Sequence, residues 1–127
     1  MEKTVIKTNK APVPVARYSQ GIKIGNMLYT QGTIALDPQT NKMVEGDIIV
    51  QTKRVFESLT AILDSAGMKP EDVIKANVYV SDLKDFQEFN KLYNAYFPAD
   101  PPPVRTTVQA KLPLNALVEV EVVAWKA

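Results

Sequence analysis

The stretch ALVEVEVVAW, residues 116–125, alternates small apolar side chains with larger or charged ones. Successive side chains of a β-strand point to opposite faces of a sheet, so the valines at the even-numbered positions share one face. Glu119 and Glu121 lie on the other face, together with Leu117 and Val123. The pattern predicts a strand with one face in the core, and the rest of the chain must supply the elements that cover that face.

Hydrophobic periodicity divides the remaining sequence into strands and helices. Gly25-Asn26 suits the two-residue turn of a β-hairpin, and Gly67 followed by Pro70 suits the end of a helix. In chain order, the expected elements are strands at 18–24 and 27–34, a helix at 47–66, a strand at 72–80, a helix at 82–97, and strands at 104–112 and 116–125. The expected order is therefore ββαβαββ, which is an α+β fold.

Both helices are expected on one face of a single mixed sheet, since strand–helix–strand crossovers are right-handed in nearly all proteins. A chain of 127 residues is expected to form one domain, residues 1–127. The core side of the last two strands is expected to consist of Thr106, Val108, Ala110, Val118, Val120 and Val122. The open side, with Arg105, Tyr29 and Trp125 nearby, mixes large apolar and polar groups and therefore predicts a subunit interface.

The composition excludes several classes of chemistry. The chain has no cysteine and no histidine, which excludes disulfides, thiolate nucleophiles, Ser-His-Asp triads and most zinc sites. A net charge of +1 and the lack of a Gly-rich phosphate loop argue against nucleic-acid and nucleotide partners. No apolar run has the length of a membrane span or signal peptide, so a cytoplasmic protein is expected, unless a mitochondrial leader has been removed.

Arg105 follows three prolines, Pro101 to Pro103, by only one residue at the start of a predicted strand. Proline fixes its own φ and restricts the residue before it, so the backbone that leads to this arginine is stiff. A guanidinium held in this way matches the planar geometry of a carboxylate. Arg105 is a candidate anchor for a small carboxylic acid, and the alternative is a structural ion pair with Glu119 or Glu121.

Two further features of the sequence could carry chemistry. Glu119 and Glu121 could orient a water molecule or transfer a proton, although they could also form a solvated strand face paired with lysines. Gly32 ends the stretch YTQG inside a predicted strand, where glycine weakens pairing. Such a glycine marks either a β-bulge or a close approach of the backbone to another group, including a ligand.

Several stretches taken together closely resemble the RidA/YjgF family. They are RYSQGIKIGNMLYTQGTIALDPQT (17–40), VIKANVYVSDLKDFQEFNKLYNAYF (73–97), PPPVRTTVQAKLP (101–113) and VEVEVVA (118–124). The resemblance covers nearly the whole chain. It implies a homotrimer of chorismate-mutase-like subunits around a central barrel, with an active site in each cleft between neighbours.

The resemblance also implies an activity. The family hydrolyses reactive enamines and imines, such as 2-aminoacrylate, its tautomer 2-iminopropanoate, and 2-iminobutanoate, to 2-oxo acids and ammonia. It does so without a metal or an organic cofactor, on substrates made by pyridoxal-phosphate-dependent serine/threonine dehydratases. By resemblance, Arg105 binds the substrate carboxylate and Glu119 holds the attacking water. The remaining site positions that the resemblance implies are Tyr18, Gly32, Asn90 and Thr107.

Arg17, Thr33, Val104 and Thr107 depart from the usual pattern of the family, and Arg17 adds a cation next to the expected site. These departures leave a second hypothesis open, a non-catalytic trimer, regulatory or chaperone-like, that binds a small ligand or a protein with the same clefts. Ribonuclease activity, which has been attached to some family members, is disfavoured because the chain has no basic stripe and no histidine.

Overall fold

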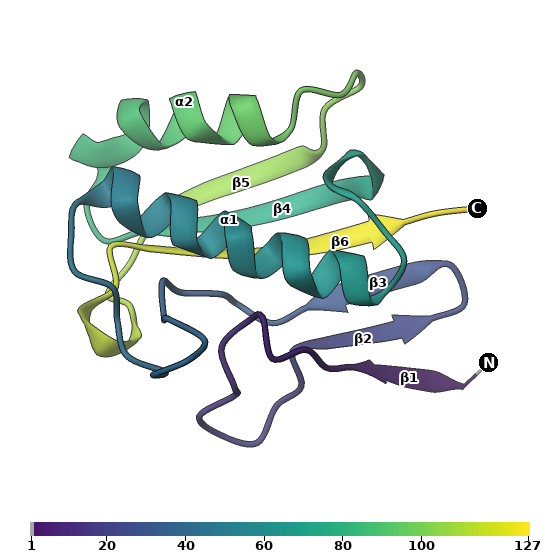
Figure 1. Cartoon of the computed structure of the whole chain (residues 1–127). Helices are drawn as coiled ribbons and strands as arrows, with labels where there is room; N and C mark the ends of the chain where they lie inside the picture. Colours follow the sequence, from purple (N-terminus) through teal and green to yellow (C-terminus); the bar gives the residue numbers. More distant parts are fainter. Residues whose placement is uncertain (1) are drawn as a thin grey trace.

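Strand β6 (Val118–Trp125) lies inside a six-stranded sheet that carries both helices on one face (Figure 1). The computed structural model describes residues 2–127. The strands lie in the order β1-β2-β3-β6-β4-β5, and all neighbours are antiparallel except β4 and β5, which are parallel. The predicted α+β fold, with two helices on one face of a mixed sheet, is therefore confirmed.

All expected strands and helices are present, and one strand precedes them. The elements are β1 (Lys3–Ile6), β2 (Gly21–Ile24), β3 (Met27–Thr30), α1 (Ile48–Ser65), β4 (Val73–Val80), α2 (Phe86–Tyr96), β5 (Val104–Gln109) and β6, with short 3₁₀ turns η1 (Pro70–Asp72), η2 (Leu83–Asp85) and η3 (Pro113–Asn115). The expected order lacked β1, because its sequence, KTVI, is too short and too exposed to show an alternating pattern.

Local side-chain hydrogen bonds determine where the helices begin and end. Asp47 caps α1, since its Oδ1 accepts from the backbone N–H of Val50 at 3.1 Å. At the other end, Lys23 and Lys126 donate from Nζ to the carbonyls of residues 66 and 67, at 3.2 and 3.1 Å. Asp82 caps η2 rather than α2, so the second helix begins four residues later than expected.

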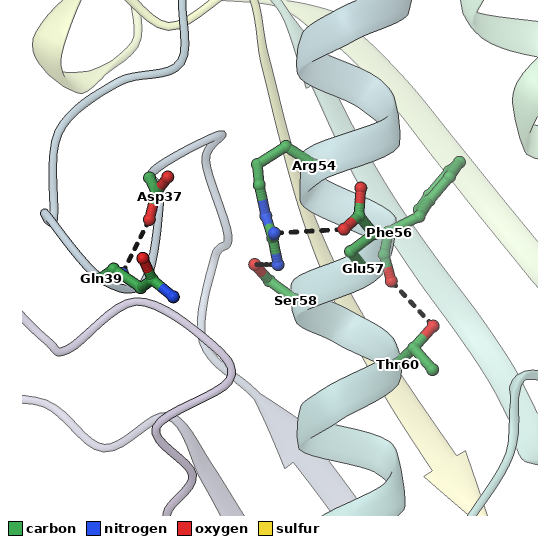
Figure 2. Close-up of polar contacts among 7 residues, drawn as sticks. All are labelled: Asp37, Gln39, Arg54, Phe56, Glu57, Ser58 and Thr60. Atoms are coloured by element: carbon green, nitrogen blue, oxygen red, sulfur yellow. Dashed lines mark hydrogen bonds and ion pairs between the residues drawn. The ribbon is translucent and has the colours of Figure 1, made fainter.

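Three side-chain hydrogen bonds of α1 stay within the helix (Figure 2). Arg54 donates to the Glu57 carboxylate and to the hydroxyl of the buried Ser58, both at 3.2 Å. Thr60 donates back to the carbonyl of Phe56 at 2.8 Å. These bonds satisfy polar groups along the helix and leave its opposite stripe free to pack on the sheet.

The core lies between this helical stripe and the even-numbered side chains of β6. Val118, Val120 and Val122 are buried as predicted, and Leu59, Ile62 and Leu63 of α1 are fully buried with them. An aromatic group joins α2 to α1, and it consists of Phe56, Phe89, Tyr93, Tyr96 and Phe97. The burial of these apolar faces supplies most of the stabilisation that holds the helices on the sheet.

The expected faces of β5 were wrong. In the parallel ladder, Arg105 lies opposite Ala76 and Thr107 lies opposite Val78, and both partners are buried on the helix side. The side chains of Arg105 and Thr107 therefore lie beneath α2, whereas Val108 is 41% exposed on the open face. The alternating pattern of β5 divides its side chains correctly between two faces. It does not indicate which face α2 covers, because β5 is an edge strand with few core contacts.

Gly32 lies in a β-bulge, one of the two alternatives that the sequence left open. Tyr29 pairs with Val123, but the next pair along the chain is Thr33 with Val120, so the hairpin strand holds one residue more than β6 across this interval. β3 consequently ends at residue 30, earlier than the expected residue 34.

The buried side chain of Gln20 holds the N-terminal segment against the hairpin. Its Oε1 accepts from the backbone N–H of Thr8 at 2.7 Å, and its Nε2 donates to the carbonyls of Thr8, Ala11 and Pro12 at 3.0, 3.2 and 2.9 Å. One amide thus satisfies four backbone groups that otherwise have no strand partner.

We expect Gln20→Ala to lower the free energy of unfolding by roughly 2–3 kcal/mol, because it leaves buried backbone groups unpaired. Urea denaturation measures the change. The matched control is Gln39→Ala, since Gln39 is exposed and its side chain makes no hydrogen bond among the described residues. Equal stability of the two variants would contradict the structural role of Gln20.

Candidate active site

A cavity of about 800 Å³ lies between the N-terminal segment, the β2–β3 hairpin, η3 and β6. Three of the predicted site residues, Tyr18, Gly32 and Glu119, line it. Much of the remaining wall is apolar and includes Val15 and Leu114, which are both largely exposed. The cavity can therefore enclose a small molecule with an apolar part beside a single carboxylate.

Glu119 lies directly against the backbone of Gly32. A Cβ atom at position 32 would overlap the Glu119 carboxylate, so only glycine allows this approach. The pKa of Glu119 is raised, first by its partial burial and second by the negative charge of Glu121. The close approach that the sequence allowed at Gly32 is thus made by a carboxylate of the same chain, in addition to the bulge.

Glu121 is held by two donors from the neighbouring strand β4. Tyr79 donates its hydroxyl proton to Glu121 Oε1 at 2.8 Å, and Asn77 Nδ2 donates to the same oxygen at 3.3 Å. The pKa of Tyr79 is raised, mainly by this hydrogen bond. Glu121 is therefore neither freely solvated nor paired with a lysine, which was the alternative expected for this strand face.

Arg105 lies on the other side of the sheet, beneath α2. Its Nη1 donates to Asn90 Oδ1 at 2.8 Å, and its guanidinium carbon lies 4.6 and 5.4 Å from the ring centres of Tyr93 and Phe86. Within residues 2–127 it forms no ion pair, so the alternative of a structural bridge to Glu119 or Glu121 was wrong. The rings of Phe86 and Tyr93 and the Asn90 amide hold the Arg105 guanidinium in place, and its remaining N–H groups can donate to another acceptor.

Two buried hydroxyl groups near Arg105 have no hydrogen-bond partner, those of Tyr93 and Thr107. Buried polar groups are nearly always paired in native proteins, so both hydroxyls have unused capacity for hydrogen bonds. Burial raises the pKa of the Tyr93 hydroxyl, and Arg105 partly opposes that shift, so the group is a proton donor near neutral pH.

The predicted residues thus form two clusters. The carboxylate cluster (Tyr18, Gly32 and Glu119) lies at the cavity, and the guanidinium cluster (Asn90, Arg105 and Thr107) lies beneath α2. Glu119 belongs to the open face of the sheet and Arg105 to its helix-covered face. One copy of the chain does not bring the two clusters together.

No motif in the sequence marks the residues that support each cluster. Phe86 and Tyr93 fall within the helix predicted at 82–97, and they flank Arg105. Tyr79 and Asn77 were assigned only to a strand. The alternation of β4 could have found them, because it puts both on the same face as the two glutamates of β6 once the strands are paired.

Among the described residues, no group of three or more acidic, histidine or cysteine side chains could hold a metal ion, and no helix is long and apolar enough to cross a membrane. Of the positions that depart from the family pattern, Arg17 is exposed and does not line the cavity, whereas Thr33 is buried and pairs with Val120. Val104 is 65% exposed.

Comparison with known proteins places the chain. The family model described as Endoribonuclease L-PSP matches residues 8–126, nearly the whole chain. The chain belongs to the RidA/YjgF/RutC family. This membership confirms the resemblance carried by the stretches at 17–40, 73–97, 101–113 and 118–124.

Individual members of the RidA/YjgF/RutC family match over almost all of this chain. A RutC family protein of Saccharolobus solfataricus is 46% identical over 126 residues, which cover 98% of this chain and 99% of that protein. The chloroplastic Reactive Intermediate Deaminase A of Arabidopsis thaliana is 40% identical over 98% of this chain and 66% of its own length. The crystal structure of E. coli TdcF with bound serine has a TM-score of 0.91 and 33% identity, covering 98% of this chain and 99% of that one.

We expect Tyr93→Phe to change the free energy of unfolding by no more than about 0.5 kcal/mol, because the hydroxyl that it removes has no partner. The matched control on the same helix is Tyr96→Phe. The Tyr96 hydroxyl is paired with Thr60 Oγ1 at 2.6 Å, and burial raises its pKa to about 12. Tyr96→Phe should cost about 1 kcal/mol in urea denaturation. A larger loss for Tyr93→Phe would show that its hydroxyl is already satisfied within the protein.

Proposed function

We propose that this protein hydrolyses small imines that carry a carboxylate, such as 2-iminobutanoate and 2-iminopropanoate, to 2-oxo acids and ammonia. The observation that carries the proposal is the pair of complementary clusters, one presenting a fixed cation with unpaired hydroxyls and the other a half-buried carboxylate beside a cavity. The Arabidopsis relative, named a reactive intermediate deaminase, supports the same reaction.

Each cluster has one task in the proposed reaction. Arg105 binds the substrate carboxylate, helped by the hydroxyls of Tyr93 and Thr107, and Asn90 keeps the guanidinium in place. Glu119 takes a proton from a water molecule while the oxygen of that water attacks C2 of the protonated imine. The resulting carbinolamine loses ammonia and leaves the 2-oxo acid, so the reaction consumes one water and no cofactor.

Because the two clusters lie on opposite faces of one sheet, the proposed site forms between copies of the chain. The open face can carry this contact, since it exposes large apolar side chains. They include Tyr29 at 51%, Trp125 at 48% and Val108 at 41% exposure. An assembly that covers these side chains and brings Arg105 of one copy to Glu119 of another completes the site, and a trimer is the assembly that we propose.

TdcF was crystallised with serine, an amino acid that is not an imine. The same clefts could therefore bind an amino-acid-like ligand without turnover, and this is the second candidate function. It predicts saturable binding of serine by calorimetry in a protein that releases no ammonia.

The proposed reaction is tested by following ammonia release from 2-iminobutanoate, generated in situ by a threonine dehydratase. We expect Arg105→Ala to lower kcat/KM roughly 10²-fold through loss of the carboxylate contact, and Glu119→Gln to lower kcat by roughly 10²-fold or more. The matched control is Arg17→Ala, which removes an exposed arginine next to Tyr18 and should keep wild-type activity. Wild-type protein that releases ammonia no faster than the uncatalysed rate would refute the enzyme.

The shared site makes a second prediction. Arg105→Ala and Glu119→Gln proteins, each strongly impaired alone, are mixed in equal amounts, unfolded and refolded together. Random assembly then joins an intact Arg105 of one copy to an intact Glu119 of its neighbour in about a quarter of the shared sites, so the mixture should recover about a quarter of wild-type activity. Light scattering must show the same assembly for every sample. No recovery in the mixture would mean that each site is built from a single copy.

A further inference from the structure

Glu119 and Glu121 are neighbours on one strand face, but their surroundings differ. Glu121 Oε1 accepts from both Tyr79 and Asn77. Glu119 accepts no hydrogen bond from the residues that the structure describes, and it is partly buried beside Gly32. Two carboxyl groups in such different environments are expected to divide the roles of anion and proton carrier.

Two donors from β4 hold the Glu121 carboxylate in place. Hydrogen bonds to a carboxylate stabilise the ionised state, and two of them converge here on one oxygen. Tyr79 remains a donor, because its hydrogen bond to Glu121, its burial and the two nearby carboxylates all raise its pKa. Glu121 is therefore a fixed negative charge on the open face of the sheet.

The groups around Glu119 do not neutralise the negative charge of Glu121. Tyr79 lies opposite Glu119 on β4, and Tyr18 and Tyr29 line the same cavity from the N-terminal segment and β3. Lys75 lies farther along the open face, opposite Val123. Within residues 2–127, neither glutamate forms an ion pair with a lysine or an arginine.

We propose that Glu121 is a positioning residue which, fixed as an anion by Tyr79 and Asn77, makes Glu119 the carboxyl group of the pair that carries the proton. This inference rests on the proposed imine hydrolysis. In that reaction Glu119 accepts the proton of the attacking water and passes it to the nitrogen that leaves as ammonia. Glu121 gains and loses no proton, and its charge keeps the proton affinity of Glu119 high enough for both transfers.

The test is a pH titration of the glutamate side-chain carboxyl carbons by ¹³C NMR in wild type and Glu121→Gln, together with the pH dependence of kcat/KM. Loss of the anion removes one of the two causes that raise the pKa of Glu119, so its titration should shift to lower pH. The acidic limb of the activity profile should shift in the same direction. An unchanged titration of Glu119 in Glu121→Gln would overturn the proposal.

Two further variants separate this effect from general disturbance. Tyr79→Phe removes the shorter hydrogen bond and keeps the ring, so the titration of Glu119 should shift in the same direction as in Glu121→Gln, but by less. Glu45→Gln removes the same charge from an exposed loop and should leave the titration of Glu119 unchanged. A shift of the same size in Glu45→Gln would also overturn the proposal.

The titration does not depend on turnover. If wild type releases no ammonia but Glu119 still shifts in Glu121→Gln, the division of charge between the two glutamates stands and the proposed reaction fails. If ammonia is released but Glu119 does not shift, the reaction stands and the role of Glu121 is refuted.

Discussion

The strict alternation of β6 is the constraint on which the rest of the structure depends. Its even-numbered side chains pack under α1, and because a one-residue slip would turn them outward, the register with β3 and β4 cannot move. The same register turns Glu119 and Glu121 to the open face. Packing in the core thus determines where the two carboxylates lie, before any ligand or second copy is considered.

Much of the fold could be predicted from short-range patterns. The helical stripes, the hairpin at Gly25-Asn26 and the valines of β6 each depend on local spacing, and each prediction was confirmed. β1 could not be found, because a four-residue edge strand takes its identity from its partner β2 rather than from its own sequence. The orientation of β5 was wrong for a related reason, since only the position of α2 decides which side of that strand is covered.

The sequence indicates candidate residues for the site but not their arrangement in space. The prolines before Arg105 predict a stiff approach to this cation, but its partners come from α2, which lies on the other face of the sheet from Glu119 and Glu121. The pairing of β4 with β6 brought in Tyr79 and Asn77, which no local motif indicated. Contacts between strands are non-local, and alternation along a single strand does not contain them.

The overlap between Glu119 and any side chain at position 32 has a consequence for evolution within this fold. An alanine at position 32 would displace the Glu119 carboxylate from its present place, because the added Cβ meets the far end of that side chain. The glycine at position 32 is therefore what allows the Glu119 carboxylate to occupy its present place. In a homologue with any larger residue at position 32, the glutamate can be retained only with its side chain in another rotamer.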